Sequence, residues 1–347
     1  MSQHKYQFTI FEYSDKINNS AATKAVADCN KIFSLRGYKD FTLTVDNTAG
    51  RTTKFYLNAF IAICKFILKV ERGALIGIQY PMLNNVFKYF IKAAKLKQIK
   101  FFCIIHDVES LRLGGNDINL VARETSNLNY YDFLIVHNDS MMKWLKEHGV
   151  TSKMHSLQLF DYLAPARPMA NNSDLSTKTI VYAGNLSKST FIYKLGAIDG
   201  WIFNVYGPHF LSDLAKDTPN LNWKGVFNPD EVVYNLQGRF GLIWDGEDVE
   251  KLDSVWGNYI KYNNPHKASL YLAAGLPVIA PRNSAIGKLV DQWEVGVLID
   301  NLTDLNNINI QEQDYLKLKN NCISVQKKLI NGYFFADALA ALEKELS

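Results

Sequence analysis

Residues 257–281 read GNYIKYNNPHKASLYLAAGLPVIAP, and this stretch carries the pattern that decides the fold. Asn264 and Pro265 are typical of a helix start, and residues 266–274 follow as a helix that Gly275 ends. The LPVIA segment after it is the short apolar run of a buried strand. A helix that leads directly into a buried strand indicates an α/β fold.

The start of this helix also suggests a binding site. Free backbone N–H groups and the positive end of the helix dipole meet there, which favours an anion. His266 and Lys267 occupy the first turn. We expect them to hold a diphosphate, and the alternative is that both residues cap and solvate an ordinary helix.

Short apolar strands alternate with helix-like segments on both sides of this stretch. Expected strands of the first half are 7–11, 41–45, 75–80, 99–105, 133–136 and 155–159, with helices at 21–35, 53–70, 86–96, 118–127 and 140–148. Expected strands of the second half begin at Thr179, Trp201, Leu221, Phe240, Leu276 and Val295. The alternation is typical of parallel sheets with crossover helices, so the sequence predicts two doubly wound α/β units.

A polar segment separates the two units. Residues 163–178 are rich in Pro, Asn and Ser and lack hydrophobic periodicity, as expected of a linker. We therefore predict a first domain at 1–162, a second at 179–331, and a C-terminal helix at 332–347 that closes the second domain or crosses back onto the first. Open α/β sheets bind ligands beyond the carboxyl ends of their strands, so two facing sheets would form a binding cleft.

Composition narrows the function classes. The 347 residues carry a formal charge of +4 with dispersed basic residues, which argues against a nucleic-acid partner. A weakly basic surface suits anionic substrates or an anionic membrane face. The four cysteines have no metal-binding spacing, and the N-terminus does not resemble a signal peptide. We expect a cytoplasmic protein, with peripheral association at the inner membrane face and homo-oligomer formation left open.

Residues 53–70, TKFYLNAFIAICKFILKV, come close to the length of a membrane span. Lys54, Lys65 and Lys69 make a span costly. A buried or interface helix is the favoured interpretation.

Three motifs resemble a known family. IIHDVESLR at 104–112, FGLIWDG at 240–246 and the 257–281 stretch are similar to bacterial GT-B glycosyltransferases of the O-antigen β-1,6-galactofuranosyltransferase kind. The resemblance to the accessory glucosyltransferases of streptococcal serine-rich adhesins is weaker. The resemblance to the O-antigen galactofuranosyltransferases implies two Rossmann-like domains facing across a cleft, with a UDP-sugar bound by the second domain and a glycan acceptor bound by the first. It also implies a role in surface polysaccharide synthesis. Galactofuranose is the favoured donor sugar and glucose the alternative.

The donor is expected at three turns of the second domain, two of which join a strand to the segment after it. Relatives place a glycine-asparagine turn with a basic residue beside the donor, and here Lys188 stands where some of them have Arg. The predicted donor-binding residues are Gly184, Asn185, Lys188, Tyr206, Gly207, Asn264, His266, Lys267 and Ser269. A plain strand-to-helix turn and a core position for Tyr206 are the alternatives. Because the chain lacks a DxD motif, lysines and helix starts would replace a metal in stabilising the leaving diphosphate, with Lys188 counted among the catalytic residues.

The acceptor side is expected in the first domain. His106 and Asp107 follow an apolar strand, where an α/β sheet presents catalytic groups, and either could take the acceptor proton in an inverting transfer. Glu109 is the reserve, and Asn19 and Ser20 are carried over from the relatives. Alternatively, Asp107 caps a turn and His106 ends a strand. A catalytically silent partner subunit of the same fold is the third hypothesis.

Overall fold

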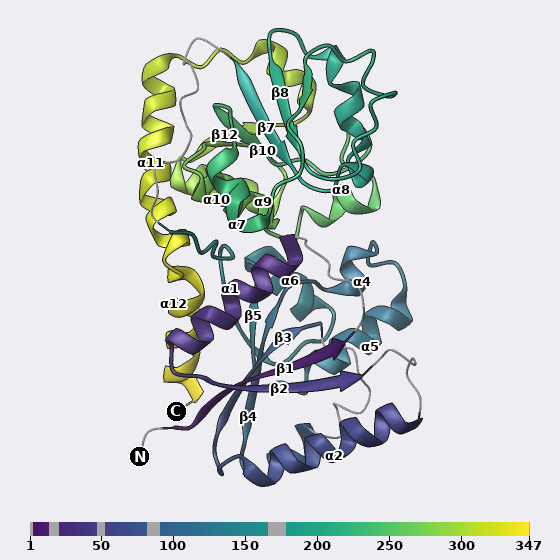
Figure 1. The fold of residues 1–347 in the computed structure, drawn as a ribbon, viewed down its shortest axis with the longest axis vertical. Coiled ribbons are helices and arrows are strands. Elements are labelled where there is room, and N and C mark those ends of the chain that lie inside the picture. The colour runs from purple at the N-terminus through teal and green to yellow at the C-terminus, as the bar shows by residue number, and fades with distance from the viewer. Residues whose placement is uncertain (1–2, 14–20, 47–52, 82–90, 166–177, 347) are drawn as a thin grey trace.

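The chain folds into two parallel sheets, one above the other along the long axis, with helices around each (Figure 1). The computed structural model describes residues 3–13, 21–46, 53–81, 91–165 and 178–346. The predicted α/β class with two doubly wound units is confirmed.

The first sheet has the strand order β2-β1-β3-β4-β5-β6. Its strands are β1 (Lys5–Tyr13), β2 (Lys39–Asp46), β3 (Leu75–Tyr80), β4 (Lys100–Ile105), β5 (Phe133–Val136) and β6 (Lys153–Ser156). Its helices are α1 (Ala21–Leu35), α2 (Thr53–Lys69), α4 (Glu109–Arg112), α5 (Ile118–Leu128) and α6 (Asp139–Glu147). β5 is buried along its whole length and β4 along all but its first residue, as expected of strands covered on both faces.

The second sheet has the order β12-β11-β10-β7-β8-β9. Its strands are β7 (Thr179–Ala183), β8 (Ile202–Tyr206), β9 (Leu221–Trp223), β10 (Phe240–Leu242), β11 (Val278–Pro281) and β12 (Gly296–Ile299). The α-helices are α7 (Pro229–Asn235), α8 (Val255–Tyr259), α9 (His266–Ala273), α10 (Ala285–Trp293), α11 (Glu312–Ile330) and α12 (Tyr333–Leu346). Three 3₁₀ segments complete it, η1 (Leu186–Lys188), η2 (Thr190–Ala197) and η3 (Leu302–Asn307). Among the described helices, none is both long and apolar enough to cross a bilayer.

Some local predictions are wrong at the ends of elements. The helix expected at 140–148 is α6, which begins one residue earlier at Asp139 and is capped by Asn138, whose side-chain oxygen accepts the N–H of Met141. The strand expected at 155–159 is β6, two to three residues earlier. The predictions for the linker and for helix 86–96 lie partly outside the described residues.

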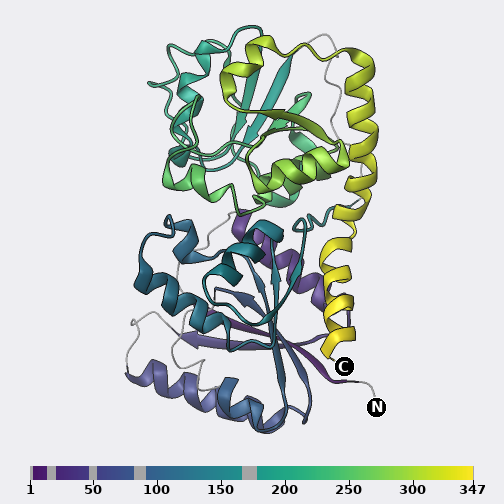
Figure 2. The same cartoon turned by 180° about the vertical axis from the view of Figure 1, so that it is seen from behind.

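The end of the chain leaves the second domain and returns to the first. α11 and α12 run along one side of both domains, with a turn at Gly332 between them (Figure 2). Gly332 has φ +75°, and a Cβ there would lie 2.9 Å from a side-chain carbon of Ile32. The ring of Phe335 then meets that of Phe33 in α1, with centroids 4.9 Å apart. One apolar core therefore extends through both domains.

Asp161 of the first domain caps α12. Its two carboxylate oxygens accept the backbone N–H groups of Phe334 at 3.1 Å and Phe335 at 2.8 Å. Burial raises the pKa of Asp161 to about 7, although these two hydrogen bonds oppose the shift. The carboxylate satisfies N–H groups that a helix start leaves without intrahelical acceptors.

We predict that Asp161→Ala lowers the free energy of unfolding by about 2 kcal/mol, the upper value for a lost helix cap. Urea unfolding at pH 8, where the carboxyl group is mostly ionised, measures the effect. Asp337→Ala is the control, because Asp337 is exposed on the same helix. Equal stabilities of the two variants would contradict the role of Asp161 as a cap.

Candidate functional site

The two sheets lie on opposite sides of the domain junction (Figure 1). In the second sheet the strand order reverses between β7 and β10, and such a switch point is where open α/β sheets bind ligands. α9 begins beside it. Across the junction, β4 and β5 of the first sheet end just before His106 and His137.

The ammonium group of Lys267 lies at this switch point. Its Nζ donates to Asp245 Oδ1 at 2.6 Å, to the Trp244 carbonyl at 3.0 Å and to the Tyr182 hydroxyl at 3.1 Å. It also lies 4.6 Å from the centroid of the Tyr182 ring. Only 13% of the Lys267 side chain is exposed. The first turn of α9 thus carries a nearly buried positive charge.

All three N–H donors of the Lys267 ammonium have protein acceptors. Burial by itself would lower the pKa of Lys267, but the nearby Asp245 carboxylate raises the pKa above its usual range. Lys267 is therefore charged at neutral pH. An anionic ligand at this point would compete with Asp245 for the ammonium group.

Gly184 and Gly207 bring the ends of β7 and β8 together. The Gly184 N–H donates to the Tyr206 carbonyl at 3.0 Å. Gly207 has φ +136°, and a Cβ there would lie 1.8 Å from the carbonyl oxygen of Gly184. Only glycine fits at position 207.

The other predicted residues of these turns have different environments. Asn185 accepts the Ser187 N–H at 3.1 Å and begins η1, which ends at the exposed Lys188. Tyr206 is 2% exposed, and its hydroxyl accepts the Gln237 N–H at 2.9 Å. Its ring is part of the core, so it offers no open face for the predicted stacking of a nucleoside.

Three imidazoles surround Phe160 at the junction. The ring of His106 stacks on Phe160 at 4.9 Å between centroids, while His137 and His266 approach edge-on at 5.1 and 6.5 Å. Burial lowers the pKa of His106 to about 3 and the pKa values of His137 and His266 to about 4. All three are neutral at pH 7.

Gln79 determines which nitrogen of His106 carries the proton. The Gln79 amide N–H groups donate to the Asn30 side-chain oxygen at 2.7 Å and the Val26 carbonyl at 3.2 Å. Its oxygen then faces His106 Nε2 at 2.7 Å. Nε2 is therefore the protonated nitrogen, and Nδ1 is left as the acceptor.

Asn264 joins the two domains just before α9. Its backbone N–H donates to His137 Nδ1 at 3.1 Å, and its side-chain oxygen accepts from Asn138 Nδ2 at 3.0 Å. Its side-chain nitrogen donates to the carbonyls of His137 and Gln158. The amide is used for contacts between domains, which differs from the predicted contact with a donor.

Asp107 also contacts the other domain. Its Oδ1 accepts the hydroxyl proton of Tyr259, at the end of α8, over 3.0 Å. Burial raises the pKa of Asp107, and the hydrogen bond from Tyr259 and the charge of Arg112 oppose that shift. Asp107 is thus a stronger base than an ordinary exposed carboxylate.

A second carboxylate holds the backbone of this loop. Glu124 is buried and accepts the N–H groups of Glu109 at 2.9 Å and Ser110 at 2.7 Å, as well as the Tyr80 hydroxyl at 2.8 Å. The Glu109 side chain pairs with Arg112 at 2.7 Å. The carboxylate of Glu109, the reserve base, is therefore engaged in an ion pair within its own helix.

At the junction, His106 and His266 lie against the ring of Phe160, and Asn264 and Asp107 each bind the opposite domain. The Lys267 ammonium is held by residues of the second domain. Ser269 is 1% exposed, and its Oγ has no hydrogen-bond partner among the described residues. Asn19 and Ser20 lie outside the described residues. Within the described ranges, no group of three His, Cys, Asp or Glu side chains is arranged to hold a metal ion.

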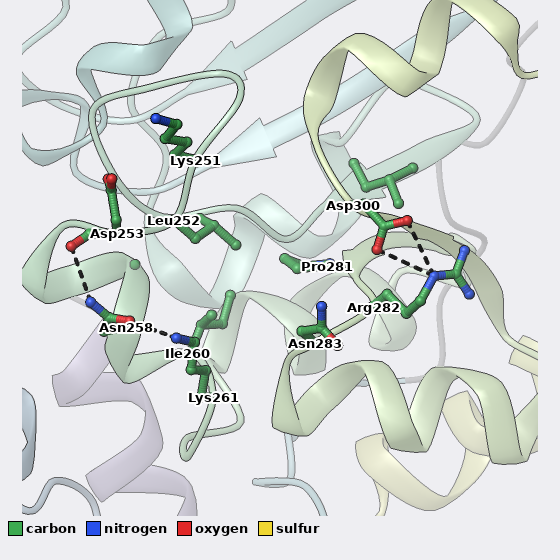
Figure 3. A pocket seen from close by; sticks show the side chains of 12 residues that line it. Lys251, Leu252, Asp253, Asn258, Ile260, Lys261, Pro281, Arg282, Asn283 and Asp300 are labelled. Carbon is green, nitrogen blue, oxygen red and sulfur yellow. Dashed lines mark hydrogen bonds and ion pairs between the residues drawn. The ribbon is translucent and has the colours of Figure 1, made fainter.

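A pocket of about 270 Å³ lies beyond the ends of β10, β11 and β12 (Figure 3). Polar side chains on its wall pair with one another, with Lys261 Nζ donating to Asn258 Oδ1 at 2.7 Å and Arg282 lying 3.3 Å from Asp300. The loop after β10 supplies Asp245 to the Lys267 cluster and Lys251, Leu252 and Asp253 to this pocket. None of the residues predicted for the donor lines it.

Sequence reasoning missed several partners at the junction. His137 follows the apolar FLIV run just as His106 follows β4, so the same strand-end argument would have found it. Tyr259 lies within the 257–281 stretch but has no spacing that points to Asp107. The pairing of Asp245 with Lys267 joins two motifs that only the fold brings together.

Comparisons with known proteins agree over most of the chain. Residues 7–159 match the family described as "Glucosyltransferase 3-like, N-terminal domain", and residues 180–342 match "Glucosyltransferase 3-like, C-terminal domain". The chain is 28% identical to the β-1,6-galactofuranosyltransferase WbbI of Escherichia coli K12, over 82% of this chain and 84% of that protein. It is 25% identical to glucosyltransferase 3 of Streptococcus gordonii, over 76% and 78% of the two chains.

Solved structures agree on the fold. The crystal structure of an α,α-trehalose 6-phosphate synthase from Burkholderia multivorans superimposes with a TM-score of 0.62 at 9% identity, covering 99% of this chain and 97% of that one. At such identity the likeness concerns the fold alone. The predicted GT-B arrangement of two Rossmann-like domains is confirmed.

Proposed function

Because the chain belongs to the glucosyltransferase 3-like family and is a glycosyltransferase, we propose that it transfers galactofuranose from UDP-galactofuranose to a sugar acceptor in surface polysaccharide synthesis. The transfer inverts the anomeric centre and needs no metal ion. The observation that carries the proposal is the nearly buried, charged Lys267 in the first turn of α9, at the switch point of the second sheet. That is where a leaving diphosphate gains most from a fixed positive charge.

In this proposal the diphosphate replaces Asp245 as the main partner of Lys267. The phosphate oxygens accept hydrogen bonds from the Lys267 ammonium and from the backbone N–H groups at the start of α9. Lys188 is exposed at the neighbouring turn and adds a second positive charge. The close backbone contact of Gly184 and Gly207 holds the ends of β7 and β8 together beside that turn.

Asp107 is the proposed base. It takes the proton of the acceptor hydroxyl as that oxygen bonds to the anomeric carbon, and the bond from that carbon to UDP breaks with its electron pair on the phosphate. The pKa of Asp107 is raised by burial, which suits a base, whereas the pKa of His106, about 3, does not. His106, protonated at Nε2, is left to accept a hydrogen bond through Nδ1.

UDP-glucose is the second candidate donor. The family description and the Streptococcus gordonii relative both carry a glucosyltransferase name, whereas the favoured sugar rests on a single relative at 28% identity. Pocket differences of a few contacts decide between such sugars.

We predict that the protein releases UDP from UDP-galactofuranose faster than from UDP-glucose when a suitable acceptor is supplied.

Thermal shifts with UDP should be the same with and without EDTA, because lysines and a helix start hold the phosphates. A panel of nucleotide sugars, followed by UDP release, measures both. Faster UDP release from UDP-glucose would favour the second donor. Loss of the UDP-induced thermal shift on chelation would show that a metal ion holds the phosphates. Release of UDP from either sugar nucleotide would exclude a catalytically silent subunit.

We predict that Lys267→Met weakens UDP binding about 10- to 150-fold, the equivalent of one lost charge-assisted hydrogen bond. Asp245→Asn should bind UDP at least as tightly as the parent protein, because it removes a competing carboxylate. Isothermal titration calorimetry with UDP measures both affinities.

Lys194 and Asp248 form a matched control pair, since they are exposed and joined at 3.1 Å. Lys194→Met and Asp248→Asn should leave UDP affinity unchanged. If Lys267→Met bound UDP normally, the ammonium group would be structural and the donor would lie elsewhere.

We predict that Asp107→Asn retains UDP affinity and loses transfer by roughly two to four orders of magnitude. Tyr259→Phe should move the acidic limb of the pH profile of kcat/KM to higher pH. The reason is that the Tyr259 hydrogen bond lowers the pKa of Asp107, so its removal raises that pKa further.

Tyr262→Phe is the control for this prediction, as a tyrosine from the same segment. An unchanged pH profile in Tyr259→Phe, together with an active Asp107→Asn, would move the search for the base to His106 and then Glu109.

A further inference from the structure

The outward side of α2 is apolar. Leu57, Phe60, Ile61 and Leu68 are between 41% and 80% exposed. Their spacing places them on neighbouring positions of one helix face. We call these four residues the α2 outer face.

The opposite side of α2 already supplies the packing that the fold needs. Phe66 is fully buried and its ring contacts those of Phe41, Phe8 and Tyr6, with centroids 4.1, 5.2 and 6.2 Å apart. α2 is therefore apolar on two sides, and the outer one does not contribute to the core. Clustered large apolar side chains on a surface indicate an interaction site.

The charged side chains of α2 itself have one sign. α2 contains Lys54, Lys65 and Lys69 and no Asp or Glu, and the last two lysines are exposed. Lys97 donates to the carbonyls of Ile67 and Val70 at 2.8 and 2.9 Å, which ties another cation to the C-terminal end of the helix. The nearest acid along the chain, Glu71, is engaged by Tyr6 and His4.

We propose that α2 docks the protein onto the surface of an anionic lipid bilayer. The α2 outer face enters the boundary between headgroups and acyl chains, and Lys65 and Lys69 reach the anionic headgroups. A second copy of this chain would bring the same lysines and no carboxylate from α2, so the charges favour lipid over self-association. α2 lies across the end of the first domain that is farthest from the second domain, which keeps the domain junction away from the bilayer (Figure 1, Figure 2).

The experiment is co-sedimentation with vesicles of phosphatidylcholine alone and of phosphatidylcholine mixed with phosphatidylglycerol. The protein should sediment with the mixed vesicles and remain in solution with the neutral ones. The double variant Leu57→Ser, Phe60→Ser should lose binding at least tenfold. Lys65→Glu with Lys69→Glu should lose about fivefold or more per lysine at low salt.

Matched controls use α11 of the second domain. Leu316→Ser replaces an exposed helical leucine, and Lys327→Glu with Lys328→Glu makes the same change in net charge. These variants should bind vesicles like the parent protein, and circular dichroism should show the same fold for all. The proposal would be overturned if the control variants lost vesicle binding equally, or if the parent protein did not bind mixed vesicles. It would also be overturned if Leu57→Ser, Phe60→Ser changed the protein from oligomer to monomer without any lipid binding.

Discussion

The buried amide of Asn264 holds the start of α9 against the ends of β5 and β6. Its hydrogen bonds with His137, Asn138 and the Gln158 carbonyl cross from one domain to the other. Because a buried amide without partners is costly, the two domains are held in the one arrangement that satisfies it. That arrangement sets the position of Lys267, three residues further on, relative to the strand end that carries His106 and Asp107. The Asp161 cap of α12 adds a second link of the same kind at the other end of the chain.

Burial also determines the charges at the junction. An ionised side chain out of water needs a partner, and Lys267 finds one in Asp245. Among the described residues, no carboxylate pairs with the three imidazoles, and burial keeps them neutral by lowering their pKa values. The charged Lys267 therefore stands at the switch point of the second sheet, with a carboxylate of raised pKa across the junction. This division suits a reaction in which one domain stabilises a leaving anion while the other accepts a proton.

The two apolar sides of α2 separate folding from docking. Phe66 and its aromatic neighbours stabilise the first domain, whereas the outer face adds nothing to the core. With α2 on a bilayer, the domain junction would lie on the side of the first domain that faces away from the lipid. The lysines of α2 make such contact dependent on ionic strength, since electrostatic attraction to lipid decays within a Debye length.

Local pattern in the sequence predicted the elements of the fold, because burial on two faces produces continuous apolar strands and because glycine and proline mark helix ends. β4, α9 and the Gly275 stop followed from such signals. The strand-end position of His106 and Asp107 and the helix-start position of Lys267 also followed, since both depend only on neighbours in the chain. Tertiary structure alone decided that Asp245 pairs with Lys267, that Tyr259 binds Asp107, that Asn264 serves the junction, and that Tyr206 is buried. These contacts join residues 22 to 152 positions apart, and no local periodicity encodes which distant side chains will share a buried hydrogen bond.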